Sequence, residues 1–286
     1  AVVQKIIPIL RKDAKRALTM KLDGFPRPYF CSFLLRDTDA FYTWAASGST
    51  CEHNRDRKRN VFCDMRVGNY RYDQTSNGGL RDNDEELESS QLTLVPIDDK
   101  QLDGLRMSLW RLSEAKFREA LSDYSIKEAR RVSTVNEASK FSSFAQVKSV
   151  RKIQKSKTEK VDETKWVEFC RSASRWISEL PGLVGNAVDF SSNQETKIFV
   201  STEGSVIVQH QQLFTISANF RKLNRNGSYI DQEIVFNCGA QKELPDLREF
   251  RKSALARYEQ LLELSKAKRV HAFSGPVLLH PGPAGV

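Results

Sequence analysis

Hydrophobic and polar positions recur along the chain with two different periods, which separate predicted helices from predicted strands. Residues 3–22 carry apolar side chains three and four positions apart, and this spacing predicts an amphipathic helix. The stretches FPRPYFCSFLLRD, AFYTWAASGS and RNVFCDMRVGNYRYD then combine aromatic and branched residues. They predict antiparallel strands, with breaks or bulges at Gly48 and Gly68.

The remainder of the first half returns to helical spacing. Residues 74–90 have almost no apolar side chains and predict a surface loop. Leucines and aromatic residues between positions 102 and 124 predict two helical stretches, with Ser113 as the N-cap of the second. Residues 133–160 are polar and basic, which favours a crossing between domains.

The second half repeats the order of helix, strands and helix. Apolar side chains from Trp166 to Leu180 share one helical face, which stops at Pro181. TKIFVST and SVIVQHQQL flank a turn at Gly204, and FTISANFRKL and SYIDQEIVFN flank an Asn-Gly turn at Gly227. Asn-Gly between alternating strands is typical of a hairpin, so we expect a second sheet. A last helix is predicted over residues 246–268.

These elements predict an α+β fold of two-layer modules, in which helices flank antiparallel sheets. We expect an N-terminal module over residues 1–132, a basic crossing over 133–160 and a second module over 161–286. A chain of 286 residues is long enough for two domains of ordinary size.

The charge balance is basic, with a formal net charge of +9. Much of the excess lies in RDRKR at 55–59 and in residues 148–160, whereas residues 81–88 are acidic. Because the charges are dispersed, we interpret them as solvated loops or a linker rather than a track for phosphates.

Composition also restricts the expected compartment. No apolar run approaches the roughly 18 residues that span a bilayer, so we do not expect a membrane protein. The first residues lack the order of regions of a secretory signal, which favours a cytoplasmic chain. Disulfides are not expected, because the cysteines are odd in number and mostly lie in apolar runs. They are Cys31, Cys51, Cys63, Cys170 and Cys238.

Motifs of the common catalytic classes are absent, including the nucleophile elbow, the P-loop and the dinucleotide-binding glycine loop. Cys51, His53 and Cys63 could be imagined as zinc ligands, but their spacing matches no recognised site and a fourth ligand is missing. His210 is interpreted as a residue on a strand face, and His280 and His271 receive no role. The sequence thus nominates no catalytic, cofactor-binding or metal-binding residue.

Six stretches in a fixed order carry a resemblance. RPYFCSFLLRD with WAASGS, RNVFCDMRVGNYRYDQT, LRMSLWRLSEAKFREALSDYSIKEA, FVSTEGSVI and FSGPVLLHPGPAG are similar to the N-terminal region of the TldD/PmbA metallopeptidase family. In that family, the resemblance implies, this region is an α+β module. A C-terminal domain with a His-Glu-x-x-x-His helix and a later cysteine binds the zinc.

The last of these stretches, residues 273–285, resembles the segment that leads into the catalytic helix. His-Glu-x-x-x-His itself does not occur in the 286 residues. A zinc peptidase needs about three protein ligands and a general acid or base. The resemblance therefore implies a zinc site in a further domain or a partner chain, and no catalytic residue is transferred to this sequence.

Three functions are compatible with these observations. The first is a non-catalytic portion or subunit of a TldD/PmbA-like zinc peptidase that acts on unfolded or small peptides and assembles as a homo- or hetero-oligomer. Edge strands such as IFVST or YFCSFLL could then hold extended peptide by strand addition. The second is a binding or scaffold protein that kept only the N-terminal module. The third is a basic nucleic-acid binder.

Overall fold

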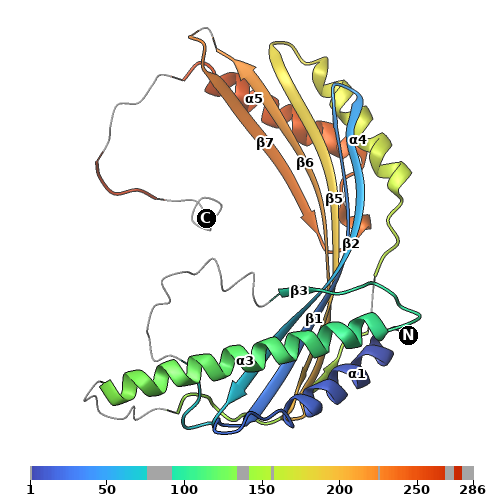
Figure 1. The fold of residues 1–286 in the computed structure, drawn as a ribbon. Helices are drawn as coiled ribbons and strands as arrows, with labels where there is room; N and C mark the ends of the chain where they lie inside the picture. Colours follow the sequence, from blue (N-terminus) through green and yellow to red (C-terminus); the bar gives the residue numbers. More distant parts are fainter. Residues whose placement is uncertain are drawn as a thin grey trace.

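The protein is described by a computed structural model, which covers residues 2–75, 92–133, 142–155, 158–224, 226–267 and 274–278. Two hairpins of long strands form its centre (Figure 1). The first consists of β1 (Pro28–Ala46) and β2 (Ser49–Val67), and the second of β5 (Leu183–Ser201) and β6 (Val206–Leu223). Shorter strands complete the sheet: β3 (Leu92–Leu94), β4 (Arg151–Ile153) and β7 (Tyr229–Cys238).

All strands of the described residues belong to one seven-stranded sheet. Its order is β3-β2-β1-β5-β6-β4, and β7 pairs with the second half of β6. The pairing is antiparallel except between β4 and β6. The α+β class with antiparallel pairing and flanking helices is thus confirmed. The expected second sheet is wrong, because β1 pairs with β5 from Ser32 to Ala45 and thereby joins the two halves.

The strands are longer than the sequence suggests. FPRPYFCSFLLRD and AFYTWAASGS contribute to a single strand, β1, so Asp37 and Asp39 lie in its middle. The basic run at 55–59 is likewise part of β2 and not a solvated loop. Both corrections have one cause: a polar stretch inside a strand resembles a loop until the residues that neutralise it across the sheet are known.

Four helices flank the sheet among the described residues: α1 (Val2–Ala17), α3 (Asp103–Ser133), α4 (Glu163–Ser178) and α5 (Leu247–Leu264). The N-cap residues of α4 and α5 are Asp162 and Asp246, whose carboxylates accept hydrogen bonds from Lys165 N and Glu249 N. The two helices predicted over 102–124 are one helix, α3. Ser113 is therefore not an N-cap; it lies fully buried within α3, where it accepts a hydrogen bond from Arg16.

Two hydrophobic cores lie on the same face of the sheet, at opposite ends of the long strands. Phe33 and Leu35 of β1 belong to the core under α1 and α3, here called the lower core. Phe41 belongs to the core under α4 and α5, the upper core. These odd-numbered positions share one face, because side chains alternate along a strand. Figure 1 shows the sheet twisting between the two helix pairs.

The predicted crossing between the halves packs along the sheet. Within it, β4 runs parallel to β6, and Val206 N donates to the carbonyl of Val150. Phe144 lies edge-on to Phe30, 4.9 Å between ring centroids, and so covers one end of the face opposite the helices. The proposed division at residues 132 and 160 stays a prediction.

Among the described residues, no helix combines the length and the apolar character that crossing a membrane would require. The cytoplasmic location stays a prediction.

Candidate functional site

A belt of ion pairs crosses the helix side of the sheet between the two hydrophobic cores. Asp37 of β1 pairs in register with Arg59 of β2, and Asp39 pairs with Arg57. Because residues two positions apart share a face, acidic side chains from β1 meet basic side chains from β2. The charged belt consists of Asp37, Asp39, Arg55, Arg57, Arg59, Asp99 and Glu163.

Each arginine of the charged belt bonds two carboxylates. Arg55 reaches Asp39 and Glu163, at 2.8 Å each. Arg57 reaches Asp37 at 2.9 Å and Asp99 at 3.0 Å. Paired bonds from a planar guanidinium fix its orientation, so the belt connects two strands with the segments that precede α3 and begin α4.

Burial increases toward the lower core. The side chain of Arg59 is 0% exposed, and its Nη2 lies 2.7 Å from Asp99 Oδ1. Burial alone would raise the pKa of Asp99, but hydrogen bonds from Arg59 and Arg57 outweigh it and leave this pKa below its ordinary value. Hydrogen bonding to Asp39 raises the pKa of Arg55. Asp99 and Arg55 are therefore ionised near neutral pH.

A polar crevice of about 370 Å³ opens beside the charged belt. Its lining comes from both hairpins and from the chain just before α4: Asp37, Asp39, Arg55, Arg57, Thr158, Glu159, Lys160, Gln194 and Thr196. Gln194 donates to the carbonyl of Glu159 at 2.8 Å, and the carboxylate of Glu159 accepts from Gln241 N at 3.1 Å. The walls are thus held by hydrogen bonds between segments distant in sequence.

The aspartates and arginines that line this crevice are paired with one another. The crevice presents carboxylates and guanidiniums that already neutralise one another, an arrangement suited to holding segments together. The belt was not predicted from the sequence, although a signal was present. Acidic residues at 37 and 39 and arginines at 55, 57 and 59 each recur at the two-residue period of a strand.

The structure separates the three residues considered as zinc ligands. Cys63 is buried with its Sγ 4.0 Å from that of Cys31, while Cys51 is exposed. His53 Nε2 lies 3.3 Å from Glu163 Oε2, beside the charged belt. Across the described part of the chain, His, Cys, Asp and Glu side chains form no group of three that could hold a metal ion.

His210 lies on β6 on the helix side of the sheet. Its Nδ1 is 2.9 Å from the hydroxyl of Thr196, and its backbone N donates to Gln154. Burial lowers its pKa, so the ring is neutral near pH 7. This agrees with a residue on a strand face. His271 and His280 lie outside the described residues.

The aromatic side chains of NYRYD pack within the protein. Tyr70 stacks on Phe144, with 6.1 Å between ring centroids, and its hydroxyl donates to Glu203. Tyr72 lies edge-on to Tyr124, and the ammonium of Lys127 is 4.4 Å from the centre of its ring. Partners within the protein thus occupy both rings at this turn.

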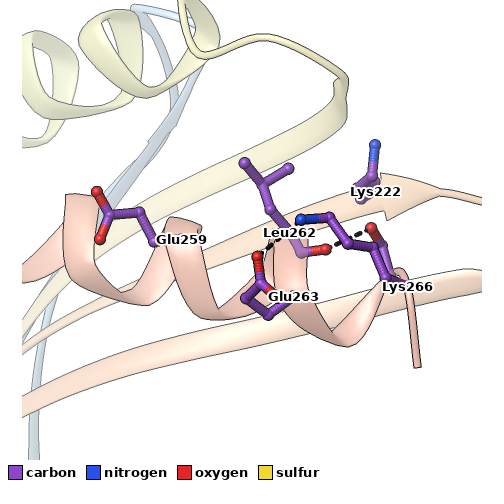
Figure 2. Close-up of a pocket in the computed structure, with 6 residues that line it drawn as sticks. Lys222, Glu259, Leu262, Glu263 and Lys266 are labelled. Atoms are coloured by element: carbon purple, nitrogen blue, oxygen red, sulfur yellow. Dashed lines mark hydrogen bonds and ion pairs between the residues drawn. The ribbon is translucent and has the colours of Figure 1, made fainter.

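A second, open groove of about 580 Å³ lies at the end of α5 (Figure 2). It is lined by Lys222 of β6 and by residues in and just after α5, among them Glu259, Glu263 and Lys266. Lys266 bonds Glu263 at 2.7 Å, one turn along the helix. All its charged groups are on the surface, so the groove brings together no buried reactive group.

The face of the sheet opposite the helices, here called the open face, carries exposed apolar and acidic side chains. They include Tyr42 of β1, Leu213 of β6 and Val235 of β7.

The prediction that two stretches bind peptide as edge strands is wrong. IFVST lies in β5 and YFCSFLL in β1, and both strands are central in the sheet.

Comparison with solved structures finds proteins of similar fold. A candidate modulator of DNA gyrase from Thermotoga maritima matches with a TM-score of 0.54 and 11% identity, over 94% of this chain and 50% of that chain. A candidate DNA gyrase modulator from Bacteroides thetaiotaomicron matches with a TM-score of 0.56 and 6% identity, over 94% and 52%. Both belong to the TldD/PmbA family. The chain has the TldD/PmbA fold.

TldE from Thermococcus kodakarensis also aligns, with a TM-score of 0.48, 6% identity and coverage of 93% of this chain and 47% of TldE. The chain spans about half the length of the TldD/PmbA structures that it matches. No protein-family model matches the sequence. The curated proteins contain no match either. The resemblance drawn from the six sequence stretches is thus confirmed as a likeness in fold.

Proposed function

We propose that this chain is a non-catalytic portion or subunit of a TldD/PmbA-like zinc peptidase that acts on unfolded or small peptides. Its role is to shape the substrate channel and the interface with the catalytic part. The observation that carries this proposal is the coverage: 94% of this chain matches TldD/PmbA structures, but only 50% to 52% of those chains is matched.

The open face supports assembly with another protein surface. Leu213 is 49% exposed, Val235 46% and Tyr42 38%, and all three lie on the uncovered side of one sheet. Exposed apolar side chains gathered on one face are typical of interaction surfaces. A homo- or hetero-oligomer, or a further domain, would cover them.

Zinc does not fit the described part of this chain. Three protein ligands with one open position are the usual catalytic set, and no such group of side chains occurs there. We therefore place the zinc, and every bond-breaking step, on the catalytic part. In this proposal the described residues form walls of the substrate channel and contacts with the catalytic part.

A scaffold protein that uses the same fold without any peptidase is the second candidate, because the open face could equally dock a non-enzymatic partner. Nucleic acid is not included in the proposal. The arginines at 55, 57 and 59 each bond carboxylates, so few of the basic charges in this run remain for phosphates.

A peptidase assay with the two components tests the proposal. The purified chain alone, and the chain mixed with a His-Glu-x-x-x-His protein from the same source, are incubated with fluorogenic unfolded peptides and zinc. We expect turnover only in the mixture, with loss on addition of a chelator. Turnover by the chain alone, or turnover by the partner that the chain leaves unchanged, would overturn it.

A further inference from the structure

The strand β7 leaves one edge of the sheet unpaired. It pairs with β6 over ten residues, from Tyr229 to Cys238, and no other strand of the described residues lies beyond it. Figure 1 shows β7 as the outermost strand of the upper half of the sheet. Such an edge presents a row of backbone N–H and C=O groups that can pair with another chain.

This edge lacks most of the devices by which proteins protect edge strands. The strand β7 contains no proline and no lysine, and its pairing with β6 shows no register shift that would indicate a bulge. The helix α5 covers one face of β7. On that face Ile234 is buried, and the ring of Phe236 lies 6.3 Å from that of Phe250, centroid to centroid. That packing lies on the helix side, and no strand among the described residues pairs with the outer edge of β7.

The charge of the edge is acidic. On the open face, Asp231 and Glu233 occupy alternate positions of β7. Asp231 bonds Arg221 at 2.7 Å, whereas Glu233 forms no ion pair within the described residues. Burial raises the pKa of the nearby Asp189, a hydrogen bond from Ser217 opposes this rise, and the charge of Glu233 adds a smaller increase.

These charges decide which strand fits. A second copy of β7, running antiparallel in the register that sets Asp231 opposite Glu233, would bring the acidic residues of both copies close together, and like charges at directly opposed positions are destabilising. A strand with Lys or Arg at alternate positions would instead neutralise Glu233. On its other side, apolar residues would extend the row formed by Ile230, Ile234 and Phe236.

We propose that the outer edge of β7 binds an extended segment of another polypeptide, with alternating basic and apolar residues, by strand addition. Backbone hydrogen bonds provide the affinity, and the acidic open-face side chains select the partner. The inference goes beyond the proposed function, because it holds for this chain whether or not a peptidase partner exists.

Fluorescence anisotropy with short peptides tests it on the intact chain. The probe is a blocked, labelled peptide of about eight alternating Lys and Val residues, within the ordinary length of a strand. An alternating Glu and Val peptide is the charge control. We expect the Lys peptide to bind at least about tenfold more tightly than the Glu peptide.

Two further comparisons separate strand addition from general attraction. Glu233→Lys should weaken binding of the Lys peptide by about tenfold, whereas Glu259→Lys, the same change on the exposed surface of α5, should leave it within about twofold. A Lys peptide N-methylated at alternate residues keeps its charge but loses strand hydrogen bonds, and should not bind.

Equal binding of the Lys and Glu peptides, or of the N-methylated and unmodified peptides, would overturn the proposal. So would equal effects of the two charge reversals, or a dimer of this chain that Glu233→Lys dissociates. None of these outcomes would affect the assembly proposal, which rests on fold coverage and is read out by peptidase activity.

Discussion

Arg59 and Asp37 are directly paired residues on neighbouring strands, and their side chains bond on the helix side of the sheet. The Nε of Arg59 lies 3.1 Å from Asp37 Oδ2, and the guanidinium is completely buried. The pair lies between the two hydrophobic cores and marks where the lower core ends and the charged belt begins.

Replacing Arg59 by Met should destabilise the protein by about 3–5 kcal/mol, because the bonds from the buried guanidinium to Asp37 and Asp99 would be lost. Arg55→Met is the matched control. Its side chain is 47% exposed, so we expect a loss of at most about 1 kcal/mol. Urea unfolding of both variants measures the difference. Equal losses would contradict a buried role for Arg59.

Acid should weaken the fold through Asp73 and Asp99. Burial alone would raise both pKa values, but hydrogen bonds, with Thr75 N the main donor to Asp73, outweigh it and hold them below the ordinary 3.8. A carboxylate with a lowered pKa stabilises the fold above its ordinary pKa, and this stabilisation is lost as pH falls through the folded value. The midpoint of urea unfolding should therefore fall as the pH is lowered from about 6 to about 3. The midpoint of the Asp99→Asn variant should fall less over the same range.

Asp189 provides the opposite case. Burial raises its pKa, with a further contribution from Glu233, so its ionised form opposes folding. Asp189→Asn should therefore raise stability near neutral pH, since an amide oxygen can still accept the hydrogen bond from Ser217. Unfolding in urea at pH 7 measures this. A variant less stable than the parent would show that the carboxylate charge has an attractive partner.

Two glycines with positive φ should respond differently to alanine. Gly227, at φ +81°, has open space where the Cβ of an alanine would lie, so Gly227→Ala should cost about 1 kcal/mol from backbone strain alone. Gly68, at φ +101°, would place a Cβ 2.5 Å from the carbonyl oxygen of Tyr72. Thermal unfolding should show a clearly larger loss for Gly68→Ala, and equal losses would refute the crowding at this bend.

The helices and turns were the part of the fold that could be predicted from the sequence. Trp166 and Phe250 both lie on apolar faces and are buried as expected, and the Asn-Gly pair ending at Gly227 does join two strands. These signals are local, since a periodic apolar face needs only one partner surface.

The sheet and the charged belt could not be predicted in the same way. Asp37 and Arg57 look like loop residues in isolation, because their neutralisation depends on cross-strand partners 20 positions apart. Pairing between β1 and β5 joins residues much farther apart in sequence, and no local pattern specifies it. The prediction of Ser113 as an N-cap was wrong for a similar reason, because its hydrogen-bond partner, Arg16, lies on another helix.

One sheet shared by two cores should unfold cooperatively. Leu105→Ala in the lower core and Phe190→Ala in the upper core should each cost about 2–5 kcal/mol. Both should shift the same urea transition, followed by fluorescence and by circular dichroism. Two separate transitions, each sensitive to one variant, would instead support independent modules over residues 1–132 and 161–286.

The central claim is that this chain works as the non-catalytic part of a TldD/PmbA-like assembly. Native mass spectrometry with zinc analysis, on material purified from the native source, tests it most directly. We predict a heavier species that contains zinc and a His-Glu-x-x-x-His sequence, in a partner chain or in a longer form of the same polypeptide. A zinc-free species of the 286-residue chain alone would contradict the claim and favour the scaffold function.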